Sequence, residues 1–121
     1  MKIGEILDFA IASAGTDRSD EGYERMLGLA LEVFKLWVRS EEKLHTLYCD
    51  TQNKYESAFQ SSIHAENDFA YDNIFIPSAS YFVAFMLAPE KSFLYDLYRE
   101  KTNEIRALCS AEKGPTGNAY I

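Results

Sequence analysis

Glu42 and His45 form the pair that comes closest to a metal-binding motif. They are three residues apart, so on a helix they share one face, as in the Glu-x-x-His motifs of carboxylate-bridged di-iron bundles. Such a centre needs a second motif and two further carboxylates, and Ser61 stands where the glutamate before His64 is required. We therefore expect Glu42 and His45 to be ordinary residues of a helix surface.

The chain also holds two histidines and two cysteines, the number of ligands that tetrahedral zinc requires. These residues are His45, Cys49, His64 and Cys109. Their spacing matches no known zinc motif, no Cys-x-x-Cys pair is present, and cysteine often packs in cores as a small hydrophobic side chain. The sequence predicts reduced, packed thiols, with no bound metal and no cofactor.

No complete nucleophile motif is present. Ser40 with Lys43, and Ser110 with Lys113, have the Ser-x-x-Lys spacing. The other motifs of the penicillin-recognising enzymes are missing, and both pairs fall at predicted helix ends, where Ser and Lys are favoured. A Cys–His pair stays open because its members meet in space rather than in sequence; the candidates are Cys49 or Cys109 with His45 or His64. We expect no catalytic site and no enzymatic activity.

Composition indicates one folded domain over residues 1–121. The chain is 47% hydrophobic and 26% charged, which is ordinary for a globular protein. Its net charge of −7 opposes nucleic acid and anionic membranes and suits a basic partner, although acidity also serves solubility. Eight Tyr, eight Phe and one Trp are a high aromatic content for cores and interfaces alike.

The first residues superficially resemble a secretory signal. Glu5 and Asp8 interrupt the apolar stretch and only Lys2 precedes it, so the uncharged core of a signal peptide is missing. We expect an amphipathic helix here and a cytoplasmic protein. No stretch of the sequence approaches the roughly 18 apolar residues of a membrane span.

Apolar residues recur at three- and four-residue steps along most of the chain, which predicts an all-α fold. The expected architecture is a compact bundle of about five helices with an aromatic, acidic loop at 67–77 and a short C-terminal tail. The predicted helices are 2–14, 20–39, 41–66, 79–88 and 89–112. Gly15 is expected to end the first helix, and Ser19 to cap the second.

A nearly heptad phase runs from Tyr23 to Phe59, and one unbroken helix over this range would be too long for a compact monomer. We expect a break at Ser40, which could cap a new helix; the alternative break is the segment 49–53. The sustained phase leaves a coiled-coil hairpin or a dimer seam open.

Proline and serine set the expected boundaries after residue 67. Pro77 should hold Ile76 in an extended conformation, and Ser78 should cap a very apolar helix. Pro89 fits the first turn of the last helix.

Two acidic clusters are the candidate partner-binding surface. Acids around exposed rings suit protein recognition, with rings as anchors and carboxylates for steering. We expect Phe69 and Phe75 to fold into the core and Tyr71 to be exposed. The proposed surface residues are Asp17, Asp20, Glu21, Glu24, Glu66, Asp68, Tyr71 and Asp72.

The expected function is a non-enzymatic protein-binding module, of the inhibitor or immunity type, that covers a basic surface of a partner such as a nucleic-acid enzyme. Direct contact with nucleic acid or membrane is not expected. One alternative is a structural helical subunit of a homo- or hetero-oligomer, including a homodimer. A second alternative is a small helical metal-binding protein or enzyme.

Overall fold

Five α-helices make up the part of the chain that the computed structural model describes, residues 1–16, 19, 21–52, 69 and 71–113. No strand occurs among these residues, so the predicted all-α fold is confirmed. In chain order the elements are α1 (Ile3–Ser13), α2 (Tyr23–Ser40), α3 (Glu42–Thr51), the 3-10 turn η1 (Asn73–Phe75), α4 (Ile76–Leu87) and α5 (Ser92–Lys113).

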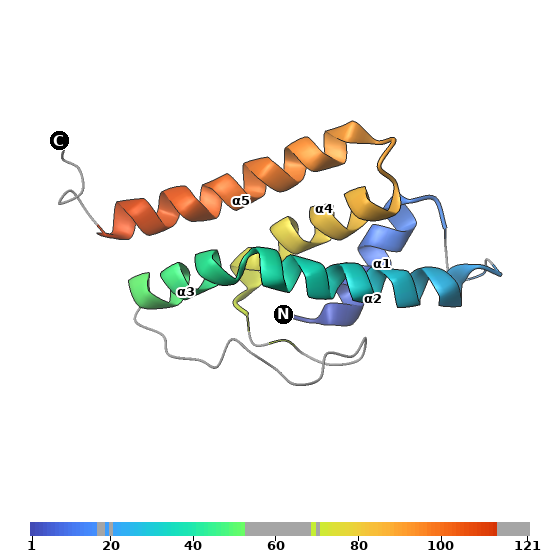
Figure 1. The fold of residues 1–121 in the computed structure, drawn as a ribbon, viewed down its shortest axis with the longest axis horizontal. Helices are drawn as coiled ribbons and strands as arrows, with labels where there is room; N and C mark the ends of the chain where they lie inside the picture. Colours follow the sequence, from blue (N-terminus) through green and yellow to red (C-terminus); the bar gives the residue numbers. More distant parts are fainter. Residues whose placement is uncertain (17–18, 20, 53–68, 70, 114–121) are drawn as a thin grey trace.

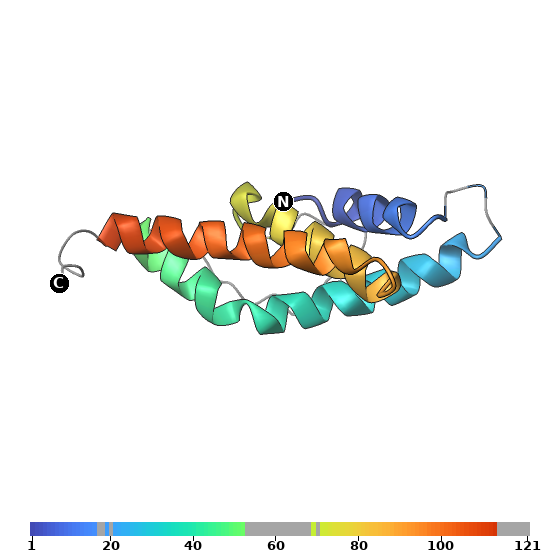
Figure 2. The same ribbon diagram turned by 90° about the horizontal axis from the view of Figure 1, so that it is seen from above.

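Helix α4 is the centre of the bundle (Figure 1). It packs against α1, α2 and α5, while α3 continues α2 and packs against α5. In the view of Figure 2, α1 and the α2–α3 line run along opposite edges; α1 packs directly on both α2 and α4, and α5 packs on α4 and α3. The apolar character of α4 on all sides, read from its sequence, is explained by these three neighbours.

A hydrogen-bonded chain of polar groups joins three of the helices inside the core. The indole Nε1–H of Trp37 on α2 donates to Ser78 Oγ on α4 at 3.0 Å, and Ser78 Oγ lies 2.7 Å from the hydroxyl of Thr102 on α5. All three side chains are buried. Because buried polar groups are stable only when paired, this chain restricts how α2, α4 and α5 can pack together.

The start of α4 differs from the prediction. Ile76 is helical, with φ −55° and ψ −49°, so the expected extended conformation before Pro77 is wrong. Asp72 accepts a hydrogen bond from the Ile74 N–H at 3.0 Å and nucleates η1, which continues directly into α4. Pro77 then occupies the first turn, where its missing N–H leaves no bond unmade. Ser78 is a core residue and does not cap the helix.

The last helix begins at Ser92. The prediction that Pro89 lies in its first turn is therefore wrong. Ala88 leaves the helical conformation, with φ −138° and ψ 69°, and Pro89 lies in the turn that follows. Lys91 closes this turn by donating its N–H to the Ala88 carbonyl at 3.0 Å. Its side chain also donates to the carbonyl of Ser13 at 2.6 Å, which ties the turn to the end of α1.

The break near Ser40 is confirmed, but its predicted cause is wrong. Glu41 separates α2 from α3 with φ −105° and ψ 16°, and no side chain caps α3. The Glu41 side chain is buried and accepts a hydrogen bond from Tyr98 on α5 instead. Helix α3 ends at Thr51, inside the alternative break segment; the rest of the predicted helix 41–66 lies outside the described residues.

The N-terminal boundaries are close to those predicted. Gly15 follows α1 with φ 92°, the left-handed conformation expected of a helix stop. Ser19 does not cap α2, which begins four residues later, at Tyr23, after Gly22. The N-terminal ammonium of Met1 donates to the carbonyls of Phe69 and Tyr71, at 2.8 and 3.1 Å, and so fastens α1 to the segment before η1.

The hydrogen-bonded chain in the core gives a stability prediction. Ser78→Ala removes the oxygen to which Trp37 Nε1 and the Thr102 hydroxyl both form hydrogen bonds, and it leaves these buried groups without that partner. We therefore expect the free energy of unfolding to fall by about 1–3 kcal/mol. Ser110→Ala, at an exposed position in α5, is the matched control and should change it by less than about 0.5 kcal/mol. Urea denaturation measures both, and equal values for the two variants would contradict the role given to Ser78.

Candidate functional site

The acidic residues predicted to bind a partner do not form one described surface. Glu21 and Glu24 are exposed near the start of α2. Asp72 is half-buried and caps η1, which is a structural role. The other predicted acids lie outside the described residues; they are Asp17, Asp20, Glu66 and Asp68.

Tyr71 is buried, with 2% of its surface exposed, so its predicted exposure is wrong. Its ring lies among Trp37, Phe69 and Phe75, at centroid distances of 5.6, 4.7 and 5.4 Å. The prediction that Phe69 and Phe75 fold into the core is confirmed. The N-terminal ammonium of Met1 holds the backbone of this segment at the carbonyls of Phe69 and Tyr71, which places these rings together in the core.

The ring of His45 lies against the ring of Tyr71. Among the described residues, no other pair of aromatic rings is closer. The two rings are parallel within 2° and their centroids are 3.6 Å apart. His45 is 1% exposed, and Phe75 lies 5.4 Å from it. The imidazole is therefore held in one orientation by aromatic neighbours.

Cys49 lies one helical turn after His45 on α3 and turns its sulfur to the imidazole. The Cys49 Sγ is 3.5 Å from Nε2 and 3.8 Å from Nδ1, within hydrogen-bonding range for sulfur. The side chain of Cys49 is half-buried, whereas Cys109 is completely buried on α5. Of the Cys–His pairs left open by the sequence, the structure brings together His45 and Cys49.

The metal motifs are not assembled in the described part of the chain. Glu42 is exposed while His45 is buried, so the two do not converge. No group of three or more His, Cys, Asp or Glu side chains in the described ranges could hold a metal ion. His64 lies outside those ranges. The Ser-x-x-Lys serines, Ser40 and Ser110, are both exposed.

The hydroxyl of Tyr71 is buried and has no hydrogen-bond partner among the described residues. Burial, together with negative charge at Glu42, Cys49 and Glu41, raises the pKa of Tyr71 to about 12. The phenol stays protonated at neutral pH and can donate a hydrogen bond.

A second tyrosine hydroxyl, that of the half-buried Tyr98, is paired. Tyr98 on α5 donates to Glu41, the residue between α2 and α3, and Arg106 lies 3.8 Å from the other oxygen of this carboxylate. Burial and the hydrogen bond to Glu41 hold the pKa of Tyr98 well above its usual value. This group connects the α2–α3 break to α5 across the bundle.

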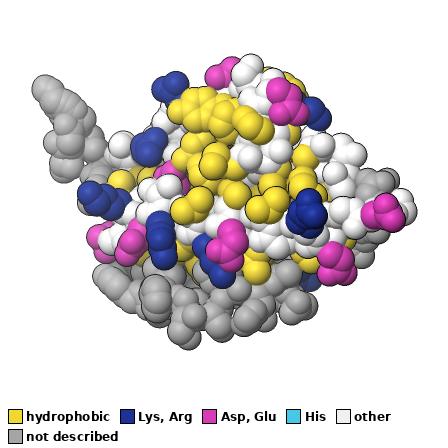
Figure 3. Space-filling model, turned by 45° about the vertical axis from the view of Figure 1, so that its right-hand side comes forward, with side chains coloured by type: hydrophobic (Ala, Val, Ile, Leu, Met, Phe, Trp, Pro, Cys, Tyr) yellow, Lys and Arg dark blue, Asp and Glu magenta, His cyan; other side chains and the backbone are white. Residues whose placement is uncertain are grey.

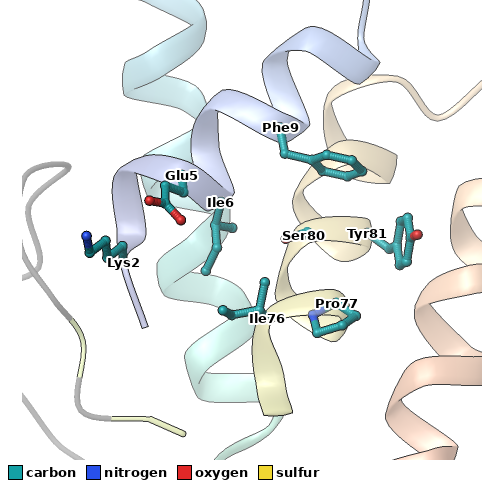
Figure 4. Close-up of a pocket in the computed structure, with 8 residues that line it drawn as sticks. All are labelled: Lys2, Glu5, Ile6, Phe9, Ile76, Pro77, Ser80 and Tyr81. Atoms are coloured by element: carbon teal, nitrogen blue, oxygen red, sulfur yellow. The ribbon is translucent and has the colours of Figure 1, made fainter. Parts of the chain in front are cut away.

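A pocket of about 320 Å³ lies between α1 and α4 (Figure 4). Its lining residues are Lys2, Glu5, Ile6, Phe9, Ile76, Pro77, Ser80 and Tyr81. Phe9 and Tyr81 meet edge to face at one end, with centroids 5.7 Å apart, and the charged Lys2 and Glu5 lie at the other. This pocket is near the lower end of the size range of ligand clefts, and its walls suit an apolar group.

Several large apolar side chains are exposed on α2, α4 and α5. Leu29 and Leu36 lie on α2, Met86 on α4, and Phe93 and Tyr95 on α5, each 42–56% exposed. Figure 3 shows hydrophobic side chains gathered on the face formed by these helices, with charges of both signs around them. Sequence reasoning missed this surface, although Leu29 and Leu36 stand off the buried stripe of α2 and are seven residues apart.

Comparisons with known proteins add no relative: the chain matches no protein-family model, no curated protein and no solved structure. None of the helices in the described part of the chain combines the length and apolar character that a membrane span requires.

Tyr71 and Tyr98 should respond differently to loss of their hydroxyl groups at neutral pH. Tyr71→Phe removes a group without a described partner and should leave the free energy of unfolding unchanged within about 0.5 kcal/mol or raise it. Tyr98→Phe removes a donor from the buried Glu41 carboxylate and should lower it by about 1.5–3 kcal/mol. Urea denaturation of both variants checks this, and a larger loss in Tyr71→Phe would refute it.

Stability should fall at alkaline pH because of the raised pKa of Tyr71. The unfolded chain releases the phenol proton near pH 10 and the folded chain near pH 12, so the folded state is stabilised below pH 10 and loses this advantage as pH rises towards 12. Tyr98 acts in the same direction. Tyr71→Phe should therefore lose less stability than wild type between about pH 8 and about pH 11 in urea denaturation. Equal losses would contradict this assignment.

Proposed function

We propose that this protein is a non-enzymatic binding module that holds a helix of another protein on the face formed by α2, α4 and α5. We name this surface the apolar face and assign to it Leu29, Leu36, Met86 and Tyr95. The observation that carries the proposal is the exposure of these large apolar side chains, because exposed patches of this kind mark interaction sites.

The packing of the helices supports an open surface here. Helices α2 and α5 each pack against α4, but within the described residues they do not pack against each other. Part of α4 therefore lies between them. Met86 follows Phe82 by four residues, so both lie on one side of α4, and Phe82 contacts Tyr98 of α5 at a centroid distance of 5.2 Å. Tyr95 contacts Phe85 of α4 at 5.3 Å, which sets it beside the same helix.

The chemistry of this surface favours a helical occupant. Exposed apolar side chains on three neighbouring helices suit an amphipathic helix, whose own apolar residues are spaced three, four and seven apart. The seven-residue separation of Leu29 and Leu36 matches two turns of such a partner. The net charge of −7 favours a partner with basic flanks and accelerates its association.

The protein acts in this proposal as an inhibitor-type factor that covers a basic surface of its partner. It contacts the partner through the apolar face rather than through the acidic loop. We place the protein in the cytoplasm, since Cys49 and Cys109 are both thiols rather than a disulfide. The acids of the chain contribute steering, and the apolar side chains contribute affinity.

Affinity capture from the source cells with matched variants tests the proposal. Leu36→Lys or Met86→Lys introduces a charge into the apolar face and should weaken the captured partner's binding by about tenfold or more in calorimetric titration. Phe93→Lys is the control, since it makes the same change at a more exposed side chain. Phe93 is two residues from Tyr95 and so on the opposite side of α5, and binding should stay within about twofold.

The outcomes separate the proposal from its alternatives. A partner that binds all three variants equally refutes the role of the apolar face. Light scattering of the purified protein decides the structural-subunit alternative: a stable dimer that Leu36→Lys dissociates would assign the apolar face to a second copy of this chain.

A further inference from the structure

His45, Cys49 and Tyr71 form a cluster of chemically reactive groups that the binding function does not use. A half-buried thiol, a buried imidazole and a buried phenol meet at the junction of α3 with the segment before η1. We propose that Cys49 is an oxidation site, at which hydroperoxides convert the thiol to a sulfenic acid with His45 as the proton acceptor and Tyr71 as a hydrogen-bond donor.

His45 is placed to activate the thiol. The thiolate is the reactive form of cysteine, and a neighbouring imidazole promotes it by accepting the proton. The sulfur is 3.5 Å from Nε2, and the parallel stacking on Tyr71 keeps the ring from turning away. One helical turn between the two residues makes this contact intrinsic to α3.

Tyr71 supplies an independent sign of a missing ligand. Its hydroxyl is buried without a partner in the described part of the chain, and a native structure seldom leaves such a group unpaired. Its ring stacks on the imidazole that the Cys49 sulfur contacts, so the phenol belongs to the same cluster. A peroxide oxygen beside Cys49, or the oxygen of the product, would accept the hydrogen bond that this hydroxyl offers.

The reaction is balanced without any further reagent. His45 takes the thiol proton, and the thiolate sulfur attacks one peroxide oxygen. An S–O bond forms while the O–O bond breaks, and the departing oxygen takes the proton from His45 to leave as water or an alcohol. Sulfur is oxidised by two electrons and the peroxide is reduced by two, which is the first step of cysteine oxidation.

Cys109 is an internal control in the same molecule. It is completely buried and lies on α5, whereas Cys49 is half-buried on α3. Hydrogen peroxide followed by a sulfenic-acid trap, with peptide mass spectrometry, measures both sites at once. We expect Cys49 to react at least about tenfold faster than Cys109, because reactivity follows exposure and thiolate character.

Two variants test the roles of the neighbouring groups. His45→Phe keeps an aromatic ring against Tyr71 but removes the proton acceptor, and should slow oxidation of Cys49 by about tenfold or more. Tyr71→Phe should slow the peroxide reaction by about fivefold, the value of one hydrogen bond, and leave iodoacetamide alkylation within about twofold. Thr46→Ala, at an exposed neighbouring position, should change neither rate.

The proposal fails if Cys49 is no more reactive than Cys109, or if His45→Phe oxidises at the wild-type rate. Where His45→Phe does not fold, Tyr71→Phe decides: equal slowing of peroxide and iodoacetamide would mean a change in access rather than a lost donor, and would overturn the role of Tyr71 and with it the site. Partner capture on the apolar face uses other residues, so the two proposals fail separately.

Discussion

The hydrogen-bonded chain from Trp37 through Ser78 to Thr102 sets the arrangement that other parts of the bundle depend on. A purely apolar core tolerates sliding of one helix along another. Buried polar groups, in contrast, can all form their hydrogen bonds in only a few relative positions of the helices. Once α2, α4 and α5 are in register, the Trp37 ring has a fixed place. Phe75 and Tyr71 then pack on it, and His45 on Tyr71.

The buried carboxylate of Glu41 exerts a similar constraint one turn beyond Trp37, at the C-terminal end of α2. Its partners Tyr98 and Arg106 both belong to α5, so the helix break is set by tertiary contacts and not by a local capping sequence. The direction of α3 follows from this, and with it the position of His45 and Cys49. The proposed oxidation site thus depends on the contact that Glu41, one turn before His45, makes with α5.

Residues whose roles depend on local chemistry could be predicted from the sequence. The helical class and the stop at Gly15 follow from periodicity and turn residues. The sequence indicates the position of the break beside Ser40 but not its cause, the contacts of Glu41 with α5. The conformation of Ile76 and the burial of Tyr71 could not be predicted: Ile76 continues the local turn that Asp72 caps, against the preference of a residue before proline, and Tyr71 is held by a tertiary contact, the stack on His45. The sequence leaves several Cys–His pairs open, because only the tertiary structure shows that His45 and Cys49 meet. The exposed surface on α2 and α5 likewise cannot be predicted without knowing how both helices pack on α4.

The central position of α4 also has a consequence for the order in which the chain can fold during synthesis. Helices α1 and α2 bury their apolar faces largely against α4, which is more than thirty residues further along the chain than the end of α2. Until α4 leaves the ribosome, Phe34 and Trp37 have no complete core to enter. At about 5–20 residues per second, the emerging chain exposes these rings for seconds, which is long enough for a chaperone to bind them.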